Sequence, residues 1–106
     1  MRIATQFRTY EDAYLKIGKY MADNSLAIEA WNRQDGPIAR LTICLTDPFL
    51  RENESYVDTN NCPWAMDFIK EYQLGKESGH VRRSGYCTYP AVTFDLEQLK
   101  KHEKEM

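Results

Sequence analysis

The residues with the most nucleophilic character in this sequence are one cysteine and two histidines. A thiolate activated by an imidazole is a known route to covalent catalysis, and Cys87 follows His80 within the same polar segment. His102 instead lies in a terminal run of lysines and glutamates, which is typical of a solvated surface. Because a cysteine is more often a small buried hydrophobe, we predict no catalytic residues. A thiol enzyme with Cys87 and His80 is kept as an alternative.

Zinc is the second chemical alternative. Cys62, His80 and Cys87 could converge with Asp58 as the fourth ligand of a tetrahedral site. With Cys44 the chain has three cysteines, but they form no CxxC pair and match no familiar zinc module. We therefore expect free thiols in a reducing compartment, with no metal and no other cofactor. A zinc-binding interaction protein stays open as an alternative.

The segment "HVRRSGYCTY" alternates cationic and aromatic side chains, as a surface for single-stranded nucleic acid does. The formal net charge of −2 argues against a phosphate-binding protein. Arginine and tyrosine are also enriched where proteins bind proteins. We therefore predict a partner-binding surface for another protein, and direct nucleic-acid binding is not expected. Its residues are Arg82, Arg83, Tyr86 and Tyr89.

Four acidic residues surround the middle of the chain, at Asp47, Glu52, Glu54 and Asp58. Paired carboxylates can perform acid/base chemistry or hold a divalent cation. Nothing in the spacing places two of them together, so the sequence predicts a solvated loop here.

Length and composition predict one small globular domain over residues 1–106. The chain has 42% hydrophobic and 28% charged residues, which is typical of a folded protein with one core. No apolar run approaches the roughly 20 residues that span a bilayer, and the N-terminal segment lacks the apolar core of a secretory signal. We expect a cytoplasmic protein without a membrane partner; its oligomeric state is left open.

The first half of the chain alternates apolar and polar residues with the period of a strand. "SLAIEAW" and "IARLTICLT" flank Asp35 and Gly36, a strong turn signal, and so predict a hairpin. Residues 10–21 fit either a helix or a strand. We favour the strand because Gly18 weakens a helix interior and "ADNS" suits a hairpin loop.

The second half predicts one main helix and one strand. Apolar residues at helical spacing begin after Pro63, with Asn61 or Cys62 as the N-cap and Gly75 at the end. Residues 75–85 are polar and predict a loop. "YCTYPAVTFDL" predicts a strand that Pro90 places at an edge or beside a bulge. A short C-terminal helix capped by Asp95 follows. The predicted fold class is α+β: an antiparallel sheet of about four to five strands packed against one main α-helix.

Two stretches, "VDTNNCPWAMDFIKEYQLG" and "SGYCTYPAVTFDL", resemble a family called domain of unknown function 4313. The resemblance runs from about Leu26 to Leu96 and implies a β region, a helix opening with proline, and carriage on bacterial conjugative and phage elements. The two stretches supply the structural signature, namely Asp58, Thr59, Asn60, Asn61, Ser84 and Cys87. We infer that both parts of the signature meet in space and hydrogen-bond each other, which would fix the helix entrance.

The resemblance also provides the functional expectation. Small proteins of mobile elements often bind and block a host defence enzyme, so we expect a non-enzymatic inhibitor of the anti-CRISPR or antirestriction type. It would act by steric occupation of a nuclease or of its nucleic-acid channel. The expected partner is a protein, such as a host CRISPR or restriction effector.

Overall fold

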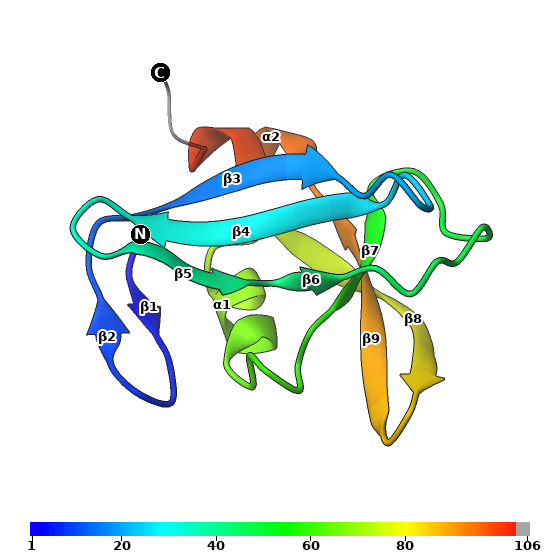
Figure 1. The fold of residues 1–106 in the computed structure, drawn as a ribbon. Coiled ribbons are helices and arrows are strands. Elements are labelled where there is room, and N and C mark those ends of the chain that lie inside the picture. Colours follow the sequence, from blue (N-terminus) through cyan, green and yellow to red (C-terminus); the bar gives the residue numbers. More distant parts are fainter. Residues whose placement is uncertain (104–106) are drawn as a thin grey trace.

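The computed structural model describes residues 1–103, which form three small antiparallel sheets and two short helices (Figure 1). The smallest sheet pairs β1 (Ile3–Ala4) with β2 (Thr9–Tyr10). The second sheet has the order β3-β4-β5, and its strands are Ala13–Lys19, Leu26–Asn32 and Gly36–Arg40. The largest has the order β6-β7-β9-β8, with strands Thr42–Ile43, Glu54–Val57, Cys87–Phe94 and Gly75–Ser84. The helices are α1 (Ala65–Glu71) and α2 (Leu96–Lys101).

The strand prediction for the first ambiguous segment is confirmed. β3 pairs with β4 from Ala13 opposite Asn32 to Lys19 opposite Leu26, and the predicted loop between them contains Asn24 at a positive φ of 61°. In β4 every second residue is buried, as its alternating pattern predicts. The turn at Gly36, with φ of 78°, confirms the hairpin from β4 to β5.

The prediction of one continuous sheet is wrong, because the chain changes sheets at Leu41. β5 ends at Arg40 and β6 begins at Thr42, which pairs with β7 instead of β4. Leu41 is fully buried at the junction, and its N–H donates to the carbonyl of Ile28 at 2.8 Å. The amide of Ile28 in turn donates to Thr42 Oγ1 at 3.0 Å. The bend therefore buries Leu41 between the sheets while its neighbours keep their backbone hydrogen bonds.

Residues 75–85 are not the predicted loop, because residues 75–84 form the ten-residue strand β8. This strand pairs with β9 and is exposed along almost its whole length, so its sequence lacks the alternation that a half-buried strand shows. β9 is a central strand, contrary to the edge that Pro90 suggests. Its pairing with β7 ends at Ala91, and the register with β8 shifts between Glu77 and Val81, which confirms an irregularity beside Pro90.

The helix α1 begins without a side-chain N-cap, so the predicted capping role of Asn61 or Cys62 is wrong. The amide-rich turn is organised by Asp58 instead. Its carboxylate accepts hydrogen bonds from the Asn61 backbone N–H at 3.2 Å and from Asn61 Nδ2 at 2.9 Å. Its carbonyl accepts the Cys62 N–H at 2.8 Å. The left-handed residue after α1 is Gln73, with φ of 55°, and not Gly75. The predicted cap of α2 is confirmed, because Asp95 accepts the amides of Glu97 and Gln98.

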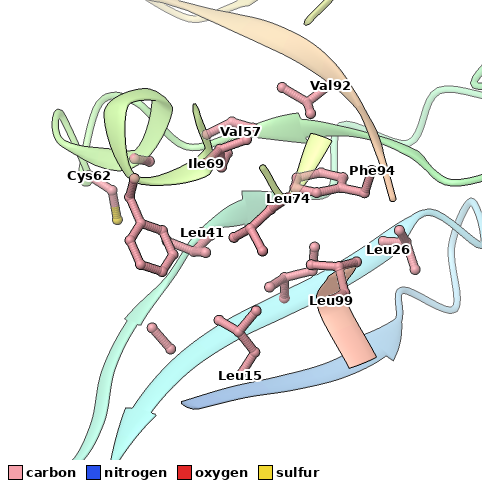
Figure 2. Close-up of a cluster of buried hydrophobic side chains, with 14 of the residues drawn as sticks. Leu15, Leu26, Leu41, Val57, Cys62, Ile69, Leu74, Val92, Phe94 and Leu99 are labelled. Carbon is pink, nitrogen blue, oxygen red and sulfur yellow. The ribbon is translucent and has the colours of Figure 1, made fainter. Parts of the chain in front are cut away.

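One hydrophobic core lies between the two larger sheets and both helices. Figure 2 shows its side chains gathered from β3, β4, α1, β9 and α2; those five elements supply Leu15, Leu26, Ile69, Phe94 and Leu99. The helix α2 also joins β3 directly, because the Leu15 N–H donates to the His102 carbonyl at 2.8 Å. Neither helix in the described part of the chain is long and apolar enough to cross a membrane.

We expect Gly75→Ala to destabilise the fold. A Cβ at Gly75 would lie 2.7 Å from the Thr93 carbonyl oxygen and 2.8 Å from Val92 Cγ1, so the start of β8 would have to move away from β9. The expected loss is about 1–3 kcal/mol in the free energy of unfolding, measured by urea denaturation. Gly18→Ala is the control, since no atom lies within 4 Å of its added Cβ, and it should change stability by no more than about 0.5 kcal/mol. Equal effects of the two changes would contradict the close approach.

Candidate interaction site on the β8–β9 hairpin

The predicted partner-binding residues lie on the β8–β9 hairpin, residues 75–94, whose turn end extends away from the rest of the protein (Figure 1). Strand register decides which side chains share a face. Tyr56 lies opposite Ala91, and Arg82 lies opposite Tyr89, so all four side chains are on one face of the β6-β7-β9-β8 sheet. The other face packs against the core through Val57 and its neighbours. We call the first the outer face.

Asp47, from the loop between β6 and β7, connects the outer face to β8. One oxygen, Oδ2, accepts the Tyr56 hydroxyl at 2.6 Å and lies 3.7 Å from Arg82 Nη1. The other, Oδ1, accepts the Phe49 amide at 3.0 Å. The hydrogen bonds from Tyr56 and Phe49, with the charge of Arg82, hold the pKa of the Asp47 carboxyl below its ordinary value. Burial and the bond to Asp47 raise the pKa of Tyr56 to about 12.

Glu54 is the second carboxylate on this face and is only 3% exposed. Its Oε1 accepts the Arg51 amide at 3.0 Å, and its Oε2 lies 3.6 Å from His80 Nδ1 on β8. Burial by itself would raise the pKa of this carboxyl. Hydrogen bonds from the Arg51 amide and the Ser78 hydroxyl outweigh burial, so the pKa of Glu54 is lowered. The His80 ring also meets the edge of Tyr56, with centroids 5.9 Å apart.

Of the four acidic residues, only Glu52 is exposed in a loop as the sequence predicts. Asp47 faces Arg82 and Glu54 faces His80, both on β8, and Asp58 is buried at the turn before α1. Sequence reasoning missed this arrangement, as it missed the role of Tyr56. His80 and Arg82 are two residues apart, which places both side chains on one face if the segment is a strand. This spacing could have predicted the contacts only if residues 75–84 were known to be extended.

The tip of the hairpin is a two-residue turn, Gly85 and Tyr86, between the paired residues Ser84 and Cys87. Gly85 has a positive φ of 62° and Tyr86 does not, which is the pattern of a type II′ turn. The Tyr86 side chain is fully exposed. Arg83 is exposed as well, and its Nε donates to the Gly85 carbonyl at 3.4 Å. The turn thus holds one tyrosine and one arginine in solvent.

Of the four predicted partner-binding residues, Arg83 and Tyr86 are accessible at the tip, whereas Arg82 is occupied in part by Asp47. Tyr89 is only 7% exposed and packs in a small cluster with Tyr56 and Ala91. Tyr89 therefore packs the hairpin against β7 and is not accessible to a partner. The predicted surface therefore reduces to the tip and the outer strand β8.

The two halves of the structural signature do not hydrogen-bond each other as the sequence analysis infers. The carboxylate of Asp58 bonds within its own turn to Asn61, and the Asp58 N–H donates to the Leu41 carbonyl at 2.8 Å. Thr59 is half-buried, while Asn60 and Asn61 are exposed. Ser84 is also exposed, at the far end of the hairpin. The signature thus marks two separate turns, one at the start of α1 and one at the hairpin tip.

The cysteines and histidines contact different partners. Cys62 is buried with its Sγ 3.5 Å from the Arg40 carbonyl, and burial with the nearby Asp58 charge raises the pKa of the thiol to about 11. Cys87 lies beside the Tyr89 hydroxyl, whose pKa the thiol raises, while His80 faces Glu54. All three cysteines are free thiols. Within residues 1–103, no three His, Cys, Asp or Glu side chains are grouped as a metal site.

We expect Tyr56→Phe to lower the stability by about 1–2 kcal/mol at neutral pH, because Asp47 loses a short hydrogen bond to its charged carboxylate. The pKa of Asp47 is lowered by folding, so its contribution is complete above the ordinary aspartate value of about 3.9 and is lost as the pH falls through the lower folded value. The cost of the substitution should shrink over the same acid range. Urea denaturation at several pH values measures both effects. Tyr86→Phe, at a fully exposed hydroxyl, is the control and should be neutral throughout.

The comparisons with known proteins agree with the resemblance seen in the sequence. No curated protein and no solved structure matches the chain. One family model matches, that of the domain of unknown function (DUF4313), and it covers residues 14–106. The match begins in β3 and includes the Asp58 turn, α1 and the whole β8–β9 hairpin. The chain therefore belongs to the DUF4313 family.

Proposed function

We propose that the protein is a non-enzymatic binding protein that uses the β8–β9 hairpin to inhibit a host defence nuclease by steric blocking. The supporting observation is the hairpin tip, where Tyr86 is fully exposed at the end of a projecting two-stranded ribbon. A large aromatic side chain in water has a favourable contact to gain when a partner covers it. Its neighbour Arg83 has no ion pair within the described residues, so it is available to an acidic group of that partner.

The outer-face contacts support this role because they hold the ribbon in place before any partner arrives. Asp47 anchors β8 through Arg82, and Glu54 anchors it through His80. Exposed ion pairs contribute little stability, but both carboxylates are themselves held by other hydrogen bonds, from Tyr56 and from the Arg51 amide. A hairpin ordered in this way loses less conformational entropy on binding than a flexible loop would.

We choose a nuclease as the partner because the sequence resemblance implies carriage on conjugative and phage elements. The proposed mechanism places the hairpin in or across the nucleic-acid channel of the enzyme. Such channels are lined with cations for phosphate binding, so the Arg83 tip would bind an acidic part of the nuclease near the channel rather than the phosphate path itself.

We predict that Tyr86→Ala abolishes most of the inhibition. The purified protein would be titrated into cleavage reactions of CRISPR effectors and restriction enzymes from candidate hosts, and the concentration for half-inhibition would be measured. Loss of an aromatic anchor should raise that concentration more than tenfold, or about 1.4 kcal/mol in binding free energy. Phe7→Ala is the matched control, because Phe7 is a comparably exposed aromatic residue in the turn from β1 to β2. It should inhibit like the wild type.

Two outcomes would contradict the proposal. The first is that a saturating concentration of the protein leaves cleavage by every tested nuclease unchanged. The second is inhibition that Tyr86→Ala and Phe7→Ala reduce equally, since this would place the contact outside the hairpin.

A further inference from the structure

The strand β8 has an open edge. It is the last strand of the β6-β7-β9-β8 sheet, so within residues 1–103 only the side that faces β9 is paired (Figure 1). An unpaired edge presents backbone N–H and C=O groups that can hydrogen-bond a further strand, and proteins generally protect long edges against this. In this strand, part of the edge is protected and part is not.

The protected part is the middle of the strand, at residues 78–80. The register with β9 shifts between Glu77 and Val81, and Gly79 has a positive φ of 94° within the irregular stretch. Such an irregularity twists an edge away from regular pairing. Beyond it, residues 81–84 pair with β9 without interruption up to the turn. Residues 75–77 also pair in register, but they border α1, so the segment 81–84 is the regular edge that lies away from the helix.

The register identifies the backbone groups at that edge. Ser84 and Cys87 flank a two-residue turn and therefore form a hydrogen-bonded pair. Because such pairs alternate with non-hydrogen-bonded ones, Arg83 and Val81 direct their N–H and C=O groups away from β9. Pro90, opposite Val81, agrees with this assignment, since proline has no N–H to give to a hydrogen-bonded pair.

The side chains at the open edge select the chemistry of an added strand. Val81 and Arg83 lie on the same face, and Val81 is 61% exposed. Arg82 points to the outer face, where Asp47 is near, whereas Arg83 has no carboxylate partner among residues 1–103. A second copy of the chain is a poor occupant, because antiparallel self-pairing of residues 81–84 sets arginines of the two copies against each other. An acidic strand is complementary.

We propose that the edge of β8 at residues 81–84 binds an extended acidic segment of a partner protein by β-strand addition. The added strand places an acidic side chain opposite Arg83 and an apolar one opposite Val81, two positions apart, while its backbone hydrogen-bonds the edge groups of both residues. This inference rests on the proposed function, because it states how the hairpin contacts its partner.

The test uses the full chain and a synthetic eight-residue probe with the repeat Thr-Glu-Thr-Val. A second probe, Thr-Lys-Thr-Val, has the opposite charge on the same backbone. We expect the Glu probe to bind at least about tenfold more tightly than the Lys probe by isothermal titration. The amide protons of Val81 and Arg83 should exchange more slowly in the presence of the Glu probe. Arg83→Glu should reverse the preference, while Arg33→Glu, the same charge change at the turn between β4 and β5, should leave it unchanged.

A pair of variants at one position separates the backbone from the side chain. Arg83→Ala removes the charge and keeps the edge N–H, so binding of the Glu probe should weaken but persist. Arg83→Pro also removes the N–H, and it should abolish binding without loss of the ladder to β9, as circular dichroism and thermal unfolding would check. Equal binding by these two variants, equal binding of the two probes, or no binding of the Glu probe tighter than about 1 mM would overturn the proposal.

These outcomes are distinct from a failure of the proposed function. If the Glu probe binds the edge but no nuclease is inhibited, strand addition stands and the inhibitor role fails. If inhibition depends on Tyr86 while the probe does not bind, the hairpin is the contact and strand addition is wrong.

Discussion

The structure depends on the burial of Leu41 at the point where the chain passes from one sheet to the other. Its N–H bonds the Ile28 carbonyl in β4, and its own carbonyl accepts the N–H of Asp58. One residue thus joins the second sheet to the turn that precedes α1, with its side chain fully buried in the common core (Figure 2). The register with which Thr42 meets Val57 follows from this position, and so does the place of the whole four-stranded sheet.

The outer face of that sheet is held mainly by polar contacts, and not by apolar packing. Among the described residues, its buried apolar side chains form a small cluster of Tyr56, Tyr89 and Ala91. A carboxylate taken out of water is costly unless it is hydrogen-bonded, and here Asp47 and Glu54 each accept a local backbone N–H and also face one side chain of β8, Arg82 and His80 respectively. The loop between β6 and β7 and the start of β7 therefore hold β8 at Arg82 and His80, while the tip stays in solvent.

The parts of the fold that could be predicted from the sequence are those in which burial follows a regular period. Buried and half-buried residues alternate along β4, so its period shows in the sequence. Asp95 directly precedes α2, so its capping role could be predicted. β8 could not be predicted, since an exposed strand far from the core has no apolar face to reveal its period. The Asp58 turn differs from the predicted cap at Asn61 or Cys62 because several short polar side chains in this stretch can bond free amides, and the sequence does not show that Asp58 is the one that does so. Asp47 and Tyr56 meet across a loop, and such tertiary contacts have no local pattern.

The pairing of β8 with β9 also has a consequence for the order in which the molecule assembles. Its two strands are joined by a turn of two residues, so its register can form by local zipping with a small loss of chain entropy. β7 meets β9 only after a long stretch of intervening chain has closed, and β6 joins the sheet through β7. We therefore expect the ribbon that we assign to recognition to form early in folding, and its contacts with Asp47 and Glu54 to form later, with the slow long-range contacts.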